Sequence, residues 1–378
     1  MIIGFDAKRA VNNFTGLGNY SRFIIDILSR YYPEAEYRLY APRNRENPEL
    51  NRIRSGRNIT MAFPDTFFSR KFPSWWRTKS ICKTLGKDRV DLFHGLSNEL
   101  PVGIARSGIK SIVTIHDLIF LRYPRYYAPA DRTIYRAKFR YACRRADRII
   151  AVSECTKRDI IGFFGISPDK IDVVYQGCDP RFGQVVGEEE KHRVKRQYRL
   201  PERFILNVGS IEERKNLLLA LQALPEIDPE VTLVAIGRKT AYTDMLYTYI
   251  RQHKLEKRVR FIHNLPHQDL PAVYQTAESF VYPSRFEGFG IPVIEAIHSG
   301  LPVVAATGSC LEEAGGDGAL YVSPDDPRRL AEALNSLSQH NGLKEKLVRA
   351  GKHHVKRFEE ERLAEQVIRT YRKAGLNL

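Results

Sequence analysis

The stretch SFVYPSRFEGFGIPVIEAIHSGLPVVAAT, residues 279–307, contains two short apolar runs separated by a segment of helix length. The runs 279–284 and 302–307 are rich in β-branched and aromatic residues, which is typical of buried strands. Between them, Gly288 and Gly290 precede Pro292, a residue that suits the first turn of a helix. The pattern predicts a strand, a glycine-rich loop, a helix and a second, parallel strand.

The same alternation of apolar runs and helix-length segments extends along the chain in both directions. The runs are 2–5, 37–41, 59–63, 92–95, 111–117, 148–153 and 171–175, and then 204–210, 232–237, 259–265, 279–284, 302–307 and 319–324. Strands separated by amphipathic helices indicate βαβ units in parallel sheets. A single eightfold barrel fits less well, because there are more than eight runs and the polar stretch 179–203 interrupts them.

We therefore expect an α/β protein with two Rossmann-like domains, whose strand-to-helix loops face each other across a cleft. The first domain is placed at 1–180, a polar linker at 181–202 and the second domain at 203–358. The remaining segment, 359–378, contains an amphipathic helix that has to dock against one of the domains. Ligands of open parallel sheets bind beyond the carboxyl ends of the strands, so the chemistry is expected on the loops there.

Composition limits the class of protein. The 378 residues are enough for two domains, and the five cysteines form no CxxC pair, which argues against a disulfide framework or a thiolate zinc site. No apolar run is long enough to span a membrane and the first residues do not resemble a secretory signal, so we expect a cytoplasmic protein. The net charge is +16, and residues 1–180 hold 31 Lys and Arg against 18 Asp and Glu. This half is expected to meet an anionic partner: a lipid surface, a phosphorylated acceptor or nucleic acid.

The loop in 285–291 is the strongest candidate for a ligand site. Backbone amides near Phe289, Gly290 and Ile291 would lie at a helix N-terminus, which attracts phosphate or sugar oxygens. Glu287 precedes this helix and Glu295 lies within it, among apolar neighbours that indicate a buried helix. Carboxylates accept paired hydrogen bonds from vicinal hydroxyls, so both residues are candidates for binding a ribose or a hexose.

A second loop of the same kind follows the run 204–210 and carries Arg214 and Lys215 at the start of a helix. Cations are disfavoured there by the helix dipole unless an anion lies between, and a diphosphate would be such an anion. No two aspartates stand two residues apart, so the DxD pattern that holds a metal on a nucleotide diphosphate is absent. We therefore expect no metal and no cofactor, with the leaving diphosphate neutralised by these cations and helix N-termini.

The first half of the chain offers two further candidates. Gly16 and Gly18 precede an amphipathic helix, where they suit a close backbone approach to a phosphate or sugar. His116 ends the run 111–117 and could donate a hydrogen bond to a transferred sugar, with Asp117 holding its ring or capping the next segment.

Basic and aromatic residues are interleaved in two segments of the first half. Residues 121–145 contain eight Lys and Arg and six Tyr and Phe, including Arg122 and Arg125. Residues 67–79 place Trp75 and Trp76 among cations. This composition is typical of a membrane headgroup interface. We predict that these four residues lie on the acceptor or membrane side and that the domain docks peripherally on an anionic membrane to reach a polyprenyl-linked acceptor.

Taken together, these motifs resemble the retaining glycosyltransferases of the GT-B fold in glycosyltransferase family 4, also called group 1. Glu287-Gly288-Phe289-Gly290 with Glu295 matches the family's E-x7-E signature, and VGSIEERKN (208–216) matches its loop with the Arg-Lys pair. TGLGNYSRFI (15–24) and TIHDLIFLRYPRYY (114–127) match its glycine loop and its His-containing segment. The second of these is also similar to mannosyltransferases that build cell-surface polysaccharides.

The resemblance implies a role for each matching residue. Glu287 and His116 would contact the transferred sugar, Glu295 the nucleotide ribose, and Arg214 with Lys215 the diphosphate. Gly16 and Gly18 would close over the donor, the amides at 289–291 would reach its sugar or phosphate, and the last helix would cross back to the first domain. The implied activity is metal-independent transfer of a hexose, with retention of configuration, from a nucleotide sugar to a glycan or lipid-linked acceptor. GDP-mannose is the first expectation for the donor, with UDP-sugars open.

Three other functions remain as alternatives. A GT-B-fold epimerase or phosphorylase would use similar loops without transfer to a glycan. A two-domain sugar-binding or nucleotide-binding protein would lack chemistry altogether, and the Arg-Lys pair argues against it. Nucleic-acid binding rests on the charge of +16 alone and is not expected.

Overall fold

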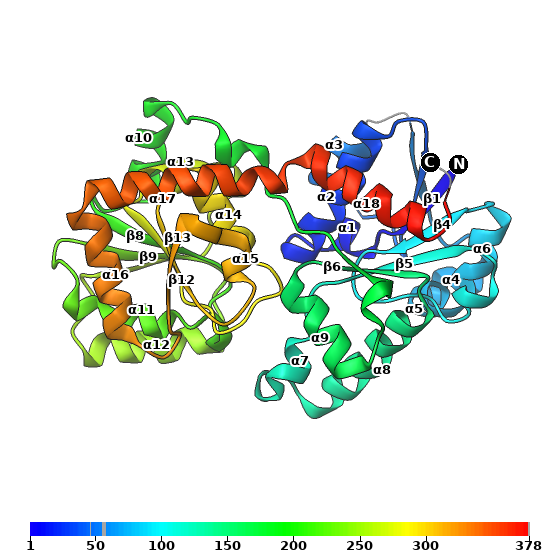
Figure 1. Cartoon of the computed structure of the whole chain (residues 1–378), viewed down its shortest axis with the longest axis horizontal. Coiled ribbons are helices and arrows are strands. Elements are labelled where there is room, and N and C mark those ends of the chain that lie inside the picture. The colour runs from blue at the N-terminus through cyan, green and yellow to red at the C-terminus, as the bar shows by residue number, and fades with distance from the viewer. Residues whose placement is uncertain (46, 55–57, 377–378) are drawn as a thin grey trace. The chain divides into compact units, whose positions relative to one another are not determined.

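A computed structural model gives the fold, and it describes residues 1–45, 47–54 and 58–376. The chain divides into two compact units, Met1–Gln176 with Glu359–Leu378, and Gly177–Phe358. Each unit is an open sheet of parallel strands with helices on both faces (Figure 1). All thirteen apolar runs identified in the sequence contain a strand, so the predicted α/β fold with two parallel sheets is confirmed.

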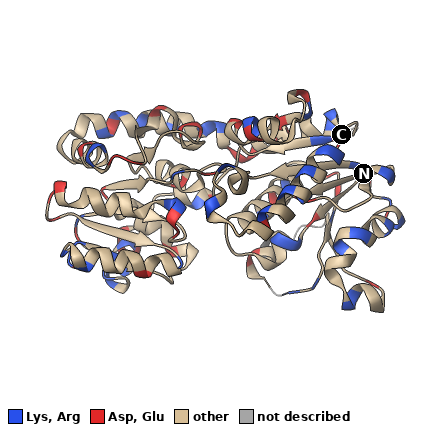
Figure 2. Ribbon diagram, turned by 90° about the horizontal axis from the view of Figure 1, so that it is seen from below, with Lys and Arg blue, Asp and Glu red and all other residues tan. Residues whose placement is uncertain are grey.

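The sheet of the first unit has seven strands in the order β3-β2-β1-β4-β5-β6-β7. Its strands are β1 (Ile2–Asp6), β2 (Glu36–Tyr40), β3 (Ile59–Ala62), β4 (Leu92–Gly95), β5 (Lys110–Ile115), β6 (Arg148–Ala151) and β7 (Ile171–Val173). Its helices are α1 (Lys8–Asn12), α2 (Gly16–Tyr31), α3 (Pro48–Arg54), α4 (Phe67–Lys71), α5 (Pro73–Trp75), α6 (Ile81–Lys87), α7 (Ile119–Arg122), α8 (Pro129–Arg145), α9 (Glu154–Phe164) and α18 (Glu360–Lys373). Figure 2 shows lysines and arginines on many helices of this unit, which holds both chain ends.

The sheet of the second unit has six strands in the order β10-β9-β8-β11-β12-β13. Its strands are β8 (Phe204–Val208), β9 (Thr232–Ile236), β10 (Val259–Ile262), β11 (Ser279–Tyr282), β12 (Val303–Ala306) and β13 (Ala319–Val322). Its helices are α10 (Glu188–Gln197), α11 (Leu217–Ala223), α12 (Ala241–Gln252), α13 (Leu270–Thr276), α14 (Ile291–His298), α15 (Leu311–Gly315), α16 (Pro327–Gln339) and α17 (Asn341–His354).

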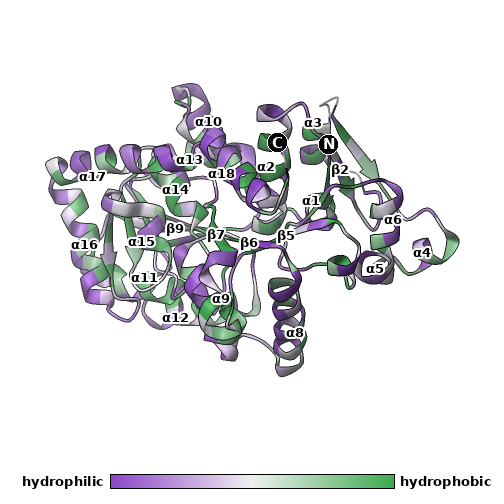
Figure 3. Cartoon of the chain, turned by 45° about the vertical axis from the view of Figure 1, so that its right-hand side comes forward, coloured by the Kyte–Doolittle hydropathy of each residue, from purple (hydrophilic) through white to green (hydrophobic). Residues whose placement is uncertain are grey.

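The central strands are buried along their whole length, because helices cover both faces of each sheet. This explains why β11 and β12 read as continuous apolar runs and not as an alternation of apolar and polar residues. The helices instead bury one side: Leu330, Ala331, Leu334 and Leu337 of α16 lie in the core of the second unit. Hydrophobic and hydrophilic residues accordingly alternate along this helix (Figure 3).

Two segments differ from the simple division into halves. The stretch 181–202, expected as a linker, belongs to the second unit, where its helix α10 packs against α13. Arg193 and Tyr198, at the end of α10, both bind the buried carboxylate of Asp269, which fastens this segment to the second unit. The C-terminal helix α18 belongs to the first unit and packs against α2 (Figure 1).

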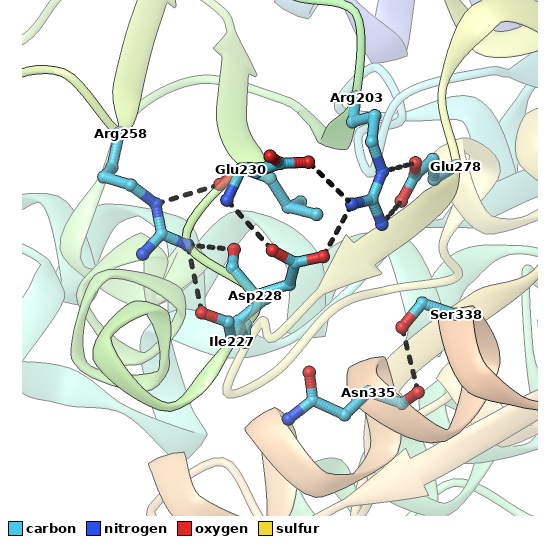
Figure 4. Close-up of polar contacts among 9 residues, drawn as sticks. Arg203, Ile227, Asp228, Glu230, Arg258, Glu278, Asn335 and Ser338 are labelled. Carbon is cyan, nitrogen blue, oxygen red and sulfur yellow. Dashed lines mark hydrogen bonds and ion pairs between the residues drawn. The ribbon is translucent and has the colours of Figure 1, made fainter.

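The amino edge of the second sheet is held by an ion-pair network (Figure 4). Arg203, which precedes β8, donates to Glu278 before β11 and to Asp228 before β9, each at 2.6 Å. A cavity of about 220 Å³ lies at this edge, and none of the predicted site residues lines it. Since ligands of open parallel sheets bind at the opposite, carboxyl edge, this network serves the stability of the unit.

Candidate active site

The predicted loops of the second unit meet where its strand order reverses. β8 and β11 are neighbours, and the chain continues from β8 to one side of the sheet and from β11 to the other. Such a reversal opens a crevice between the two loops at the carboxyl ends of the strands. The loop after β8 carries Arg214 and Lys215, and the loop after β11 carries Glu287.

Hydrogen bonds hold these two loops together. The backbone amide of Arg285 donates to the carbonyl of Arg214 at 2.9 Å, and the Arg214 guanidinium donates to the carbonyl of Phe286. Asn216 occupies the N-cap position of α11 in a left-handed conformation, with φ of 57°. Its side-chain amide donates to the carbonyls of Pro283 and Pro324 and does not cap the helix.

Glu287 is the centre of the site and binds both cations. One carboxylate oxygen lies 2.9 Å from Nη1 of Arg214, and the other lies 2.6 Å from Nζ of Lys215. Tyr282, the last residue of β11, accepts a hydrogen bond from Lys215 at 2.6 Å and donates to Glu287 at 3.3 Å. Glu287 is 8% exposed, so the cluster is a nearly buried group of two cations, one carboxylate and one phenol.

The electrostatics of this cluster follow from burial and pairing. Burial raises the pKa of Glu287, but the charges of Arg214 and Lys215 outweigh it and lower the value to about 2. Burial lowers the pKa of Lys215, yet the Glu287 carboxylate leaves it above its ordinary value. Burial raises the pKa of Tyr282 to about 12. At neutral pH the site therefore holds two cations, one anion and a neutral phenol.

The helix α14 begins at Ile291, as the sequence predicts, with Gly290 at its N-cap position. Gly290 has a φ of 124°, and a Cβ atom there would lie 2.7 Å from the Leu311 side chain, so only glycine fits. Phe289 is buried, so its ring is not available to a ligand, and only its backbone can face the crevice. The thiol of Cys310 lies 3.1 Å from the carbonyl of Glu287 and 2.7 Å from that of Phe289, which braces the loop from behind.

Glu295 lies one helical turn into α14 and is 9% exposed. Burial raises its pKa to about 7, and nearby Asp179 adds to this, although a 2.9 Å hydrogen bond from the hydroxyl of Tyr274 opposes it. Glu295 is therefore a carboxyl group that gains and loses its proton near neutral pH. Its environment differs from that of Glu287 because no cation among the described residues is paired with it.

The sheet of the first unit also reverses its order, between β1 and β4, and the segment after β1 forms α1 and a short loop; Gly16 and Gly18, expected before the next helix, lie in the first turn of α2. Asn13 braces this loop, because its side-chain oxygen accepts from the amides of Thr15 and Gly18. A Cβ atom on Gly18 would lie 1.8 Å from the carbonyl oxygen of Asn13, whereas a Cβ atom on Gly16 would meet nothing within 4 Å. The packing against Asn13 therefore requires glycine at position 18, whereas position 16 has space for a side chain.

His116 follows β5 and is buried, with the ring of Tyr20 from α2 edge-on at 4.6 Å. Its Nε2 lies 2.9 Å from the carbonyl of Leu96, which only accepts, so Nε2 carries the proton. Nδ1 then accepts from the amide of Gln176 at 3.2 Å. Burial lowers the pKa of His116 to about 4, so the ring is neutral. These two partners hold the ring, while Asp117 accepts from the amide of Ile119.

The predicted membrane-side residues divide into two groups. Trp76 is 2% exposed and packs in the core of the first unit, so its prediction as a surface residue is wrong. Trp75 is exposed, and Arg122 is paired with Asp159 while the Arg125 guanidinium lies over the ring of Tyr126. Trp76 follows α5 and begins a new helical turn, Trp76–Ser80, and two adjacent tryptophans in the sequence do not show which of them that turn directs into the core.

Two tyrosines of the site were missed by sequence reasoning. Tyr282 and Tyr274 bind Glu287 and Glu295, yet each reads as an ordinary aromatic residue of an apolar segment. Only the position of Tyr282 as the last residue of a strand before a glycine-rich loop could have signalled its role. Among the described residues, no group of three His, Cys, Asp or Glu is arranged to hold a metal ion.

Comparisons with known proteins agree with this architecture. The family described as glycosyl transferases group 1 matches residues 188–354, and the family described as glycosyltransferase family 4 matches residues 24–182. The O-antigen chain mannosyltransferase B of Escherichia coli is 30% identical over 291 residues, which cover 74% of each chain. The O-antigen chain mannosyltransferase RfbU of Salmonella typhimurium is 27% identical over 227 residues, which cover 60% of each chain.

Solved structures show the same fold at low sequence identity. The Anabaena protein HepE in complex with UDP and glucose has a TM-score of 0.76 at 19% identity, over 98% of this chain and 99% of that one. Sucrose-phosphate synthase from Thermosynechococcus elongatus also has a TM-score of 0.76 at 19% identity, over 99% of this chain and 98% of that one. The two parallel sheets, the family matches and the bacterial relatives lead to one conclusion: the chain is a group 1 glycosyltransferase, also called family 4, with the GT-B fold.

Proposed function

We propose that this glycosyltransferase moves a hexose, with mannose as the first candidate, from a nucleoside-diphosphate sugar to a glycan or polyprenyl-linked acceptor with retention of configuration. The relatives named as O-antigen mannosyltransferases support mannose and a role in cell-surface polysaccharide synthesis. The single observation that carries the proposal is the buried cluster of Arg214, Lys215 and Glu287 at the strand reversal of the second sheet. We place the reaction in the cytoplasm, where nucleotide sugars serve as donors.

The cluster supports a metal-independent departure of the diphosphate. Two fixed cations in a crevice stabilise the negative charge that develops on the leaving group, and they need no reorganisation when the bond breaks. Lys215 remains protonated in spite of its burial, so its charge is present at the pH of the cell. The N-terminus of α14, beginning at Ile291, adds a favourable dipole for phosphate or sugar oxygens.

The remaining site residues fit the two ends of a nucleotide sugar. Glu295 is a buried carboxyl that can accept hydrogen bonds from the two hydroxyls of a ribose. Glu287 would contact the transferred sugar beside the diphosphate. In the first unit, the open space at Gly16 suits a close approach of the donor. Both nitrogens of the neutral His116 ring are engaged, by Gln176 and by the Leu96 carbonyl, so its proposed contact with the sugar would require one of these hydrogen bonds to be exchanged for one to a sugar hydroxyl.

A thermal-shift panel tests the donor site. GDP, UDP, ADP and their sugar conjugates are added to the wild-type chain and to Lys215→Ala, with and without magnesium. A ligand at about 100 times its dissociation constant stabilises by about 2.7 kcal/mol, which raises the melting temperature measurably. We expect a shift with one nucleotide that magnesium does not change and that Lys215→Ala abolishes. The absence of any shift would contradict the donor site and favour the sugar-binding or nucleic-acid-binding alternatives.

A transfer assay then separates the enzyme from an epimerase. The nucleotide sugar that gives the thermal shift is supplied with and without a polyprenyl-diphosphate-linked glycan. A transferase extends the glycan, and the anomeric configuration of the product, read by nuclear magnetic resonance, tests retention. Conversion of the nucleotide sugar to an isomer without acceptor would support the epimerase reading instead.

We further propose that the first unit docks on an anionic membrane surface. Four exposed aromatic rings gather on α4, α5 and the residue between them: Phe67, Phe68, Phe72 and Trp75, at 84%, 54%, 45% and 43% exposure. The Phe68 ring lies 4.9 Å from Phe72 and 5.2 Å from Trp75, and Figure 3 colours the start of α4 as hydrophobic. Arg70 and Lys71 lie on the same short helix. Exposed aromatic rings beside cations are typical of membrane interfaces.

No helix in the described ranges is long and apolar enough to cross a membrane. Vesicle flotation tests the docking with phosphatidylcholine vesicles and with vesicles that contain an anionic lipid. We expect recovery with the anionic vesicles to fall severalfold in Phe67→Ser/Phe68→Ser/Trp75→Ser. Val185→Ser is the matched control, because Val185 is 91% exposed and lies in the second unit. Equal recovery with neutral and anionic vesicles would refute the proposal.

A further inference from the structure

Both cations of the second-unit site pair closely with one internal anion, Glu287, and Arg214 lies in addition 3.8 Å from the partly exposed carboxylate of Glu212. Glu287 gives one carboxylate oxygen to Arg214, at 2.9 Å, and the other to Lys215, at 2.6 Å. The side chains of both cations are 15% exposed and that of Glu287 is 11% exposed, so water screens the pairs weakly. A diphosphate that binds Arg214 and Lys215 therefore has to compete with the carboxylate of Glu287.

The Glu287 carboxylate stabilises two cations that would otherwise destabilise the fold. Two cations that are adjacent and nearly buried repel each other, and a buried cation without a partner loses several kcal/mol of solvation. Lys215 would respond by losing its proton, because burial favours the neutral amine. The carboxylate keeps it protonated and holds both side chains at fixed positions. The two cations are thus preorganised for an anion of about two negative charges.

We propose that Glu287 is an internal stand-in for the donor diphosphate, which holds Arg214 and Lys215 in place and gives both up when the donor binds. The inference rests on the proposed donor site and adds how that site is loaded and emptied. The exchange replaces one set of charge-assisted contacts by another, so no buried cation is left unpaired at any stage. The released carboxylate is then available to a hydroxyl of the sugar.

The same exchange acts in reverse after transfer. The product nucleoside diphosphate has no sugar to occupy the Glu287 carboxylate, so this group again competes for Arg214 and Lys215. Glu287 therefore weakens the binding of the bare nucleoside diphosphate and promotes its release. Removing Glu287 should therefore strengthen binding of the nucleoside diphosphate, whereas removing a residue that only helps to hold the donor would weaken it.

Isothermal titration calorimetry at low salt tests the sign with GDP and with UDP as probes. We expect Glu287→Gln to bind the nucleoside diphosphate about tenfold more tightly than the wild type, since removing a charge from a close pair typically changes affinity by at least this factor. Glu295→Gln is the matched control, because Glu295 is a buried carboxyl of the same site that has no paired cation. Because Glu295 is itself proposed to bind the ribose, this variant should bind the nucleoside diphosphate more weakly than the wild type, opposite in sign to Glu287→Gln.

A double-mutant cycle separates competition from simple repulsion. If Glu287 competes for Lys215, the gain in affinity produced by Glu287→Gln shrinks in a Lys215→Ala background. The substitution of Glu287 then has no Lys215 ammonium to free for the diphosphate. A gain of undiminished size would show repulsion between Glu287 and the diphosphate, and would overturn the stand-in role. Equal or weaker binding by Glu287→Gln would overturn it as well.

The two proposals fail in different ways. Binding of neither GDP nor UDP by the wild type, or binding unchanged in Lys215→Ala, contradicts the donor site itself. Binding that depends on Lys215 but gains nothing from Glu287→Gln contradicts the stand-in role alone. If Glu287→Gln does not fold, a crystal structure of the wild-type chain with the bound nucleoside diphosphate decides. Arg214 and Lys215 should then contact phosphate oxygens in place of Glu287, and unbroken pairs with Glu287 would refute the exchange.

Discussion

Glu287 and Glu295 lie eight positions apart, one before the start of α14 and one within it, and their pKa values are shifted in opposite directions. The pKa of Glu287 is lowered to about 2 and that of Glu295 is raised to about 7. Both are buried, so the difference comes from their partners: two cations for Glu287 and a tyrosine hydroxyl for Glu295. The first is an anion under all physiological conditions, whereas the second changes charge near neutral pH.

This difference predicts a pH dependence of folding. Glu295 ionises with an ordinary pKa of 4.5 when unfolded and with about 7 when folded, so the folded protein binds more protons between these values. Its contribution to stability is therefore fully present below about pH 4.5 and is lost as the pH rises through about 7. Urea unfolding at about pH 5 and pH 8 should show the wild type losing up to about 3 kcal/mol more than Glu295→Gln. Glu365→Gln on the surface of α18 is the control, and parallel profiles for wild type and Glu295→Gln would contradict the raised pKa.

The two glycines of the first loop predict different phenotypes for the same substitution. Gly18→Ala places a Cβ atom against the Asn13 carbonyl and should lower the free energy of unfolding by about 2 kcal/mol or more. A Cβ atom on Gly16 meets no atom of the described residues within 4 Å, and the residue lies in the first turn of α2, so stability in Gly16→Ala should stay equal or rise by about 0.5–1 kcal/mol. If the donor approaches Gly16, transfer should nevertheless fall at least about tenfold, a loss of about 1.4 kcal/mol in transition-state stabilisation. Unchanged kinetics in a well-folded Gly16→Ala would remove this residue from the donor site.

At the scale of elements, the C-terminal helix α18 is tied to the first sheet by a buried hydrogen bond. The Tyr371 hydroxyl lies 2.7 Å from Nδ1 of His94 in β4, and the other ring nitrogen of His94 lies 2.8 Å from the hydroxyl of Thr114 in β5. Burial lowers the pKa of His94 to about 3, so this is a neutral network. The same Thr114 hydroxyl lies 3.0 Å from that of Tyr20, and the Tyr20 ring packs on His116, so α18 is linked through three side chains to a predicted sugar-site residue.

Removing the hydroxyl with Tyr371→Phe should destabilise the first unit. The loss leaves a buried nitrogen of His94 without its partner, which costs about 1–3 kcal/mol. Arg369→Ala on the exposed side of the same helix is the control and should stay within about 0.5 kcal/mol of the wild type. Chemical denaturation measures both variants. Equal stability of Tyr371→Phe and wild type would mean that the apolar face of α18 alone holds the helix.

At the scale of the whole molecule, the first unit is assembled from two distant segments of the chain. Helix α18 adds the buried side chains of Leu363, Val367, Ile368 and Tyr371 to a unit whose other elements end at Gln176. A chain truncated to residues 1–358 exposes the surface that these residues cover. Burial of one such side chain contributes about 1.5–3 kcal/mol, so the sum approaches the whole stability of a typical domain.

We therefore predict that truncation after Phe358 unfolds the first unit at a lower temperature and spares the second. Differential scanning calorimetry should resolve a transition of the first unit at reduced temperature. The thermal shift produced by the donor nucleotide should persist in the other transition, because the cations and both glutamates of that site lie in 177–358. A single transition at the wild-type temperature would contradict this assignment of α18.

Local patterns in the sequence determined the thirteen strands, the parallel arrangement, the loops that carry Arg214, Lys215 and Glu287, and the helix that carries Glu295. Runs of β-branched residues, glycine turns and helix-start prolines act over a few neighbouring positions, so they can be read without knowing the fold. The stretch 181–202 resembles a linker because most of its residues are polar, and the sequence does not show long-range contacts such as that of Tyr198 with Asp269.

Tertiary structure alone decided which groups meet. Glu287 finds Lys215 across 72 positions of sequence, Glu295 finds Tyr274, and Trp76 turns inward while Trp75 stays exposed. These pairings set the charge and pKa of the two glutamates, and burial sets the accessibility of the two tryptophans. The Glu287 pairing depends on β8 and β11 lying side by side in the sheet. The sequence by itself determined which residue types stand at the strand ends. The folded chain determined their partners, because burial and Coulomb interactions depend on distance in space and not on separation along the chain.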